Sequence, residues 1–467
     1  MRKILLSKVA FLLLFAVSAT FSVFGQVTTS AISGIVSDDN GEGLPGATVI
    51  AIHEPTGTKY GTTTRVDGNF NLVNLRVGGP YKLTVSFIGY NQKVEEGIYT
   101  TLGSNNVVNF KMLEQGKTLN EVVVTGSSSD IFGAGKTGTS TTINKQALQT
   151  LPTIGSRSIN DFTKYNAQGN GRSFGGQDSR FNNFSIDGSV FNNGFGLGSS
   201  AQAGGRTNST AISLDAIEEL TVNVAPFDVR QSGFVGAGLN AITRSGSNNL
   251  TGSVFHSFRN ESSTFNGSAA RDIPVKIGKY NESIYGFRLG GPIIKNKLFF
   301  FINGETQRRV EPVSVSGVSY IAKESTNPGT PTRVLTADLN TVSSLLKSKY
   351  SYDTGVFENY DDETKSDKFM ARLDYNLNDA NKVTLRYTFH QSQDYVPISN
   401  SSSAGFGNRI TTNSMSYKNS GYLIQDNTSS IVAEVNSTIK GKIANNFIIG
   451  YDKQNEDRAY AGAIFPT

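Results

Sequence analysis

The chain has 467 residues, of which 37% are hydrophobic, 10% are aromatic and 49 are glycine. This composition favours β structure and turns over helices, and the length allows two or three domains. Cysteine is absent, which excludes disulfides, thiolate metal sites and thiol nucleophiles. The net charge is +5, but 43 basic residues are scattered among 38 acidic ones without a basic block. Nucleic acid is therefore not an expected partner, whereas anionic lipid headgroups fit the mild positive excess.

Residues 1–25 have the pattern of a cleaved secretory signal peptide. Arg2 and Lys3 precede an apolar run at 9–17, and Gly25 supplies a small residue for cleavage. An uncleaved anchor helix is the alternative, but spanning a bilayer takes about 20 apolar residues and this run is shorter. No later segment is long and apolar enough for a transmembrane helix, so a membrane-spanning mature protein would have to span with strands.

Residues 26–115 are expected to form a small all-β sandwich. Short alternating segments are separated by turn residues, as in sandwich domains. Asp67-Gly68 lies between two such segments and predicts a two-residue hairpin. The predicted strands are 32–36, 47–52, 62–66, 69–73, 81–87 and 107–110.

A short β-prone run follows within residues 116–128. It consists of Glu121, Val122, Val123, Val124 and Thr125, and a Gly/Ser stretch comes directly after it. One interpretation is a final strand of the sandwich. The other is a strand offered to a partner by β-addition, in which backbone hydrogen bonds supply the affinity.

Residues 129–249 mix glycine-rich loops with helical and strand signals, which indicates a compact α+β domain. Asp187-Gly188 is expected to close a hairpin rather than to touch a ligand. A polar loop containing Asn192, Asn193 and Phe195 is a candidate ligand-facing surface. Helices are predicted at 145–151, 156–165 and 213–220, and strands at 183–186 and 219–224.

Five arginines of this region are candidates for a charged surface. If this region lies inside a barrel formed by the later strands, these arginines are expected chiefly to pair with carboxylates on the inner face of the barrel wall. They are Arg157, Arg172, Arg180, Arg230 and Arg244.

From about residue 250 to 467 apolar and polar residues alternate with a period of two, in segments close to the 9 to 11 residues of a tilted transmembrane strand. The hairpin at 286–305 is one example, with Tyr285, Phe287 and Leu289 on one face. His390 falls on the predicted lumen face, where an ordinary wet wall position is favoured over substrate contact. About seven wall strands are expected.

Short and long connections between these strands alternate, which is typical of outer-membrane barrels. A soluble sandwich would explain the alternation of faces but not that of loop lengths. The short connections are 294–297, 376–381 and 441–445, and the long ones are 260–282, 308–366 and 392–429.

No catalytic, metal or cofactor site is expected, so the chain is not predicted to be an enzyme. Its three histidines, His53, His256 and His390, lie in different regions, and no HExxH motif occurs.

Several stretches resemble known families. SGIVSDDNGEGLPGATVIA, TTTRVDGNFNLVNL and YKLTVSFIGY are similar to the carboxypeptidase-regulatory-like, or transthyretin-like, domain. Further along, SRFNNFSIDGSVFNNGFGL, ISLDAIEELTVNVAPFDVRQSGFVGAGLNAITRSGSNNLTGSVFHSFRNES and GGPIIKNKLFFF resemble the Oar-like subgroup of TonB-dependent outer-membrane receptors.

The resemblance implies a mainly β protein: a signal peptide (1–25), a carboxypeptidase-regulatory-like sandwich (26–115), a TonB-box-like segment (116–128), an α+β plug (129–249) and the first strands of a transmembrane antiparallel β-barrel (250–467). It further implies an outer-membrane location and uptake of a large or scarce ligand, such as an oligosaccharide, peptide, siderophore or protein. TonB would pair with residues 121–125 and use the proton-motive force.

Two expectations qualify this reading. A plugged barrel needs about 22 strands, so the chain is expected to be a fragment of a longer receptor. The alternative function is a secreted or surface-displayed adhesin that binds glycans or matrix.

Overall fold

The computed structural model describes twelve ranges of the chain. The predicted signal peptide, the run at 121–125, Phe195 and Arg230 lie outside them. Among the described helices, none combines the length and the apolar character that crossing a membrane requires. The ranges are 27–115, 139–150, 157–170, 172–194, 200–226, 231, 233–261, 280–314, 319–327, 329–398, 411–439 and 443–462.

Residues 27–115 form a sandwich of two four-stranded sheets, here called the N-terminal sandwich. One sheet has the order β4-β1-β7 with β8 also paired to β1, and the other has the order β3-β2-β5-β6. Alternate residues of both sheets, such as Ile32, Val49 and Leu83, form one buried core. The strands are β1 Ser30–Ser37, β2 Thr48–His53, β3 Thr58–Thr63, β4 Asn69–Leu75, β5 Gly78–Ser86, β6 Lys93–Thr100, β7 Asn105–Val107 and β8 Phe110–Lys111.

The hairpin expected around Asp67-Gly68 is wrong in its pairing. The turn itself forms, with Asp67 Oδ1 accepting a hydrogen bond from the Asn69 amide at 3.0 Å. However, β3 pairs with β2 while β4 pairs with β1, in the opposite sheet. A two-residue signal reports only the local turn, because the sheet that the next strand joins depends on where its buried side chains pack.

Residues 139–249, the central domain, are built on a five-stranded sheet of order β11-β10-β13-β12-β9. The β10–β13 pair is parallel and the other pairs are antiparallel. The elements are β9 Thr139–Asn144, α2 Lys145–Thr150, α3 Ile159–Thr163, η1 Ser179–Phe181, β10 Asn183–Ile186, β11 Ser189–Val190, η2 Gly205–Thr207, η3 Leu214–Ala216, β12 Ile217–Val224 and β13 Ala237–Thr243.

The helix predicted at 213–220 is wrong. Ser213 caps only the single 3-10 turn η3, accepting from the Asp215 amide at 3.3 Å. The chain then continues as β12, whose eight residues are all buried except the half-buried Glu218. Positions between two neighbouring strands favour the extended form, and this packing overrides the weak helical periodicity.

From residue 251 the chain forms a seven-stranded antiparallel sheet, here called the wall sheet, in which sequential strands are neighbours. The predicted number of strands is confirmed. The first has 10 residues, as expected, but the other six are longer than expected, at 14 to 18 residues. They are β14 Thr251–Asn260, β15 Asn281–Ile294, β16 Leu298–Pro312, β19 Asp361–Asn376, β20 Asn381–Val396, β21 Tyr422–Ile439 and β22 Ile443–Tyr460.

The two faces of the wall sheet have the reverse polarity of a water-soluble protein. On β20, Leu385 and Tyr387 are 42% and 41% exposed, whereas Arg386 and His390 are 1% and 0% exposed. The predicted alternation is therefore confirmed. A sheet that buries charge and exposes aliphatic side chains is suited to lipid on its outer face.

Connections at one end of the wall sheet are short and those at the other end are long, as predicted. We call these the short-turn end and the long-loop end. The long connection between β16 and β19 carries β17 Tyr320–Ile321, β18 Thr330–Pro331 and α4 Thr336–Tyr350, and η4 Lys418–Ser420 precedes β21.

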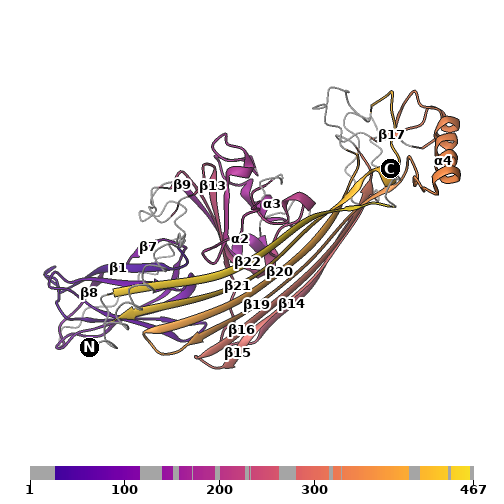
Figure 1. Ribbon diagram of the computed structural model, residues 1–467. Helices are drawn as coiled ribbons and strands as arrows, with labels where there is room; N and C mark the ends of the chain where they lie inside the picture. The colour runs from indigo at the N-terminus through magenta and orange to yellow at the C-terminus, as the bar shows by residue number, and fades with distance from the viewer. Residues whose placement is uncertain are drawn as a thin grey trace, which may run out of the picture.

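Figure 1 shows how these parts are arranged. The central domain lies against one face of the curved wall sheet, and the N-terminal sandwich lies at the short-turn end, to the left of the central domain in this view. Helix α4 lies at the opposite end, beyond the long loops. The chain thus places two separate domains against the polar side of a single sheet.

Candidate functional site

The interface between the central domain and the wall sheet is centred on Asp187. This residue and Gly188 have φ values of 44° and 74° and form the tight turn between β10 and β11. The turn places the Asp187 carboxylate against the wall, where it accepts from Nη1 of Arg386 at 2.8 Å and Nη1 of Arg372 at 3.3 Å. Thr243, at the end of β13, donates to it from its amide at 2.8 Å and its hydroxyl at 2.6 Å.

The charges continue beyond Asp187 into the wall. Arg372 also donates to Asp374 at 2.8 Å, and Asp374 is 1% exposed. We call Asp187, Thr243, Arg372, Asp374 and Arg386 the central seam. Burial would raise the pKa of the Asp187 carboxyl, but the charges of Arg372 and Arg386 and the Thr243 hydrogen bonds outweigh it and hold that pKa below its usual range.

A second ionic contact lies on β16 and β19. Lys368 donates to Oε1 of Glu305 at 2.7 Å, and both side chains are buried. Ser213 of the central domain donates to the other oxygen of Glu305 at 2.6 Å, and Lys368 also donates to the Thr210 hydroxyl at 3.3 Å. The hydroxyl that caps η3 thus also bonds a wall carboxylate.

A third contact lies nearer the long-loop end. Arg206 of the central domain donates to Glu456 on β22 at 3.1 Å, and Asn193 donates to the other oxygen of the same carboxylate. The Gly204 amide donates to Asp426 on β21 at 2.7 Å. Contacts of this type are charge-assisted and therefore strong for their size.

The interface also contains apolar contacts and polar groups without a partner. Phe301 and Met370 point inward from the wall sheet and belong to the hydrophobic core of the central domain. Around them, several buried side-chain atoms of β20 and β21 have no hydrogen-bond partner among the described residues: Arg386 Nε and Nη2, Thr388 Oγ1, His390 Nδ1, Thr428 Oγ1 and Ser430 Oγ. A largely polar interface can be hydrated when its surfaces separate, which makes relative movement less costly than parting an apolar core.

The predicted pairing of Arg157, Arg180 and Arg244 with wall carboxylates is wrong. Arg157 pairs with Asp215 at 3.1 Å and Arg180 with Asp178 at 3.0 Å, both within the central domain. Arg244 likewise donates to the Ile217 carbonyl at 2.9 Å, and its nearest carboxylate is Glu218, 3.8 Å away in the same domain.

The contact at Asp187 instead runs from wall arginines, Arg372 and Arg386, to a carboxylate of the central domain. Sequence reasoning assigned Asp187 to a hairpin, which is confirmed, and missed its ionic role. The only sequence signal for this ionic role was that Arg372 and Arg386 fall at inward-facing positions of two wall strands.

His390 is not a wet wall position. It is fully buried, and its Nε2 lies 3.1 Å from the Ser209 hydroxyl of the central domain. A wall residue faces water only where the lumen is empty, and here the central domain covers it. Among the described residues, no group of three or more histidine or acidic side chains is placed to hold a metal ion.

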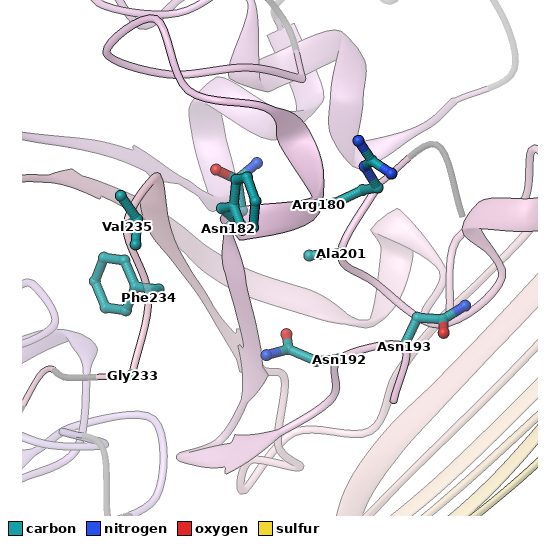
Figure 2. A pocket seen from close by; sticks show the side chains of 9 residues that line it. Arg180, Asn182, Asn192, Asn193, Ala201, Gly233, Phe234 and Val235 are labelled. Carbon is teal, nitrogen blue, oxygen red and sulfur yellow. The ribbon is translucent and has the colours of Figure 1, made fainter. Parts of the chain in front are cut away.

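The predicted polar loop borders a small cavity of about 190 Å³ on the central domain. Figure 2 shows Asn192 and Asn193 on one side of it, Phe234 and Val235 on another, and Arg180 above. Asn192 is already bonded, however, accepting from the Phe184 amide at 2.7 Å and donating to Asn183 at 2.8 Å. The polar groups of Asn192 therefore serve the domain itself, and the side chain of Asn193 bonds the wall through Glu456.

Known proteins match two regions of the chain. Residues 31–113 match the carboxypeptidase regulatory-like domain family, and residues 242–465 match the outer membrane beta barrel domain family. This is an outer-membrane protein. The expected location, fold class and family resemblance are thereby confirmed.

Individual relatives are more distant. The TonB-dependent transporter Oar of Myxococcus xanthus is 29% identical over 136 residues, which are 28% of this chain and 12% of that protein. Among solved structures, the siderophore receptor PirA from Acinetobacter baumannii aligns with 16% identity and a TM-score of 0.41, covering 68% of this chain and 40% of that one. The outer membrane transporter YddB from Escherichia coli aligns with 11% identity and a TM-score of 0.44, covering 67% and 38%. The chain thus spans about two fifths of these solved proteins and a smaller share of Oar.

Proposed function

We propose that this outer-membrane protein is a TonB-dependent receptor that takes up a large or scarce ligand using the proton-motive force. In this proposal the central domain is the plug, the short-turn end faces the periplasm and the long-loop end faces the cell exterior. The observation that carries the proposal is the inside-out wall sheet, whose buried arginines hold a separate domain by way of Asp187. The similarity to Oar supports the assignment of the coupling partner.

The work of such a protein is mechanical. The plug must stay in place at rest and must move when force is applied. Interfaces built from a few ionic contacts meet both needs, because each contact is specific in geometry yet can be replaced by water as the surfaces part. The three ionic contacts described above are arranged in this way between the central domain and the wall sheet.

The coupling strand is proposed to be Glu121 to Thr125. It lies between the last sandwich strand, β8, and the first strand of the central domain, β9. Strand β9 is an edge strand that pairs only with β12 among the described strands. A partner that paired with residues 121–125 and pulled would therefore load the edge of the central domain directly.

The ligand is proposed to meet the long loops and the outer part of the central domain. The candidate ligand-facing residues are Asn192, Asn193 and Phe195, and Asn193 is bonded to the wall through Glu456. Displacing this contact is one way in which ligand binding could be communicated to the plug–wall interface. Oligosaccharides, peptides, siderophores and proteins all remain candidate ligands.

Replacing Val123 with proline tests the coupling role. Proline removes the backbone donor that an added strand needs, whereas alanine keeps it. Uptake of labelled ferric siderophores, oligosaccharides and peptides is measured in cells with and without a protonophore. V123P should abolish the protonophore-sensitive part of uptake while V123A keeps it, and unchanged active uptake in V123P would disprove coupling through this strand.

A second readout does not depend on the ligand. Because the chain has no native cysteine, a V123C variant can be tested for disulfide formation with cysteine variants of TonB in living cells. Cross-linking at position 123 is expected, and failure at every position tried from 121 to 125 would contradict the partner assignment.

A further inference from the structure

The N-terminal sandwich makes direct contacts with the short-turn end of the wall sheet. Asn74 donates to the Ser437 and Asn445 carbonyls at 3.3 and 3.2 Å, on either side of the β21–β22 connection. Asn376, at the end of β19, donates to the Thr58 hydroxyl at 2.9 Å. The sandwich therefore holds the turn ends of more than one wall hairpin.

It also contacts the central domain and the adjoining segment. The Leu102 amide donates to Oε1 of Glu219 on β12 at 2.7 Å, and the Asn248 amide donates to the Pro55 carbonyl at 2.8 Å. Together these contacts place the sandwich against the short-turn end of the wall sheet, next to the central domain (Figure 1).

One side chain joins all three parts. Arg76, between β4 and β5, donates from Nη1 to the Ser245 hydroxyl at 2.5 Å and from Nη2 to Asp374 at 2.9 Å. Its own carbonyl accepts from the Tyr81 hydroxyl at 2.7 Å and from the Thr100 hydroxyl at 3.1 Å. The guanidinium is therefore presented from a backbone position that is fixed by the sandwich.

Arg76 enters the central seam through Asp374. Asp374 also accepts from Arg372, and Arg372 in turn donates to Asp187. An unbroken series of charged contacts thus runs from the sandwich through the wall to the turn of the central domain.

The sandwich also completes the charge balance of this region. Glu434 on β21 is within electrostatic reach of Arg372 and accepts from the Thr28 hydroxyl at 2.5 Å. With Arg76 in place, three arginines (Arg76, Arg372 and Arg386) face three carboxylates (Asp187, Asp374 and Glu434). Without the sandwich, one carboxylate is in excess and Glu434 loses a donor, which a buried site tolerates poorly.

We propose that the N-terminal sandwich is a lid on the short-turn end of the wall sheet and that Arg76 holds it there. Docking of the lid and the ionic contacts of the central seam then stabilise each other. The lid must release before the central domain can move far. This proposal depends on the proposed function only for the assignment of the short-turn end to the periplasmic side of the membrane. Its tests require neither TonB nor a ligand.

Docking is tested with a disulfide between the lid and the β15–β16 turn. A Cβ built on Gly57 would lie 3.4 Å from Cβ of Asn296, a separation close to that of natural disulfides. In the full chain in outer membranes, G57C/N296C is expected to form an internal disulfide, and neither single variant can do so. Because Gly57 has a φ of 63°, the G57C single variant also controls for backbone strain. If G57C folds and the double variant stays reduced after oxidant is added, the lid does not occupy this position.

Coupling is tested by hydrogen exchange on the full chain. The Thr243 amide donates to Asp187 and therefore reports on the central seam, and the Leu102 amide donates to Glu219 and reports on lid docking. R76A should speed exchange in peptides covering both sites by roughly tenfold, the change produced by losing about 1.4 kcal/mol of protection. R65A, which removes an exposed arginine of the same domain, should leave both unchanged.

Reciprocity gives the decisive comparison. If the two events are coupled, D187N must also speed exchange at Leu102, although position 187 is not in the lid. Faster exchange at Leu102 in R76A with no change at Thr243, or no response of Leu102 to D187N, would show that Arg76 is only a docking contact. Failure of TonB cross-linking at every position from 121 to 125 would contradict the proposed coupling partner and leave these results unaffected.

Discussion

Arg386 on wall strand β20 donates from Nη1 to Oδ2 of Asp187 at 2.8 Å, across a sequence separation of 199 residues. The arginine is 1% exposed and the aspartate 5% exposed. This pair joins a turn of the central domain to the middle of a membrane-facing sheet, and several expected outcomes depend on it or on its surroundings.

Replacing Asp187 with asparagine should loosen the central domain. Asparagine tolerates the positive φ of this position, so the turn is kept while two buried arginines lose their shared anion. Removing one partner of a buried pair typically costs about 3–5 kcal/mol. The measurement is the urea concentration at which the central domain becomes sensitive to protease. D178N, which affects an exposed pair with Arg180, is the control, and equal shifts in the two variants would contradict the role of Asp187.

Replacing Gly204 with alanine should disturb docking against β20. Gly204 has a φ of 84°, and an added Cβ would lie 2.7 Å from Cε1 of His390. Gly176 is the matched control, because its φ is 75° and an added Cβ meets nothing within 4 Å. Both variants bear the backbone strain, and G204A should cost about 1–3 kcal/mol more through overpacking. Equal melting temperatures for the two full-length variants in detergent would argue against close packing at this point.

An arginine on the outer face of the wall should impair membrane assembly in a depth-dependent way. Leu385 and Gln391 both point outward from β20. Leu385 lies among the outward apolar residues Val383, Leu385, Tyr387 and Phe389, whereas Gln391 lies beyond them towards the long loops. L385R should disfavour the inserted state by about 2–4 kcal/mol, and Q391R by about 1 kcal/mol or less. The folded fraction in outer membranes is measured by heat-modifiable gel mobility. A larger defect for Q391R would place the lipid boundary elsewhere.

The N-terminal sandwich should lose stability in mild acid because of His53. Burial, aided by the charge of Arg76, lowers the pKa of His53 from 6.5 to about 3. The folded state therefore resists protonation that the unfolded state accepts. The contribution of neutral His53 to the free energy of unfolding is fully present above pH 6.5. It is lost as the pH falls towards 3, by up to about 5 kcal/mol for this shift.

Calorimetry of the full chain at several pH values checks this expectation. The imidazole packs against Tyr81 at a ring separation of 5.0 Å, so H53F keeps an aromatic contact while removing the titrating group. The sandwich transition of H53F should depend less steeply on pH between 6.5 and 4. An unchanged slope would assign the acid sensitivity to other groups.

The wall sheet could be predicted closely from the sequence. Apolar residues such as Phe369 alternate with polar ones such as Lys368 because one face of the sheet meets lipid and the other meets the central domain. This alternation gives the sequence a period of two, which can be read without the structure. Strand lengths were underestimated, since the polar ends that continue each strand beyond the lipid resemble loops in composition. The helix expected at 213–220 failed for the opposite reason: a local pattern was overridden by the two strands that flank β12.

The candidate site was only partly accessible from the sequence. Asp187-Gly188 was assigned to the correct turn, and His390 to the correct face of β20. Nothing in the local sequence pairs Asp187 with Arg386, or Arg76 with Asp374, because spacing along the chain carries no information about which buried charges meet.

The sequence by itself determined the β-rich composition, the alternating faces of the wall and the alternation of its loop lengths, since these follow from local periodicity and turn chemistry. Only the tertiary structure decided which charges meet across the interface, and that the N-terminal sandwich reaches the same cluster through Arg76. Such contacts depend on how separate domains dock, and docking is governed by the balance of buried charge over the whole assembled surface.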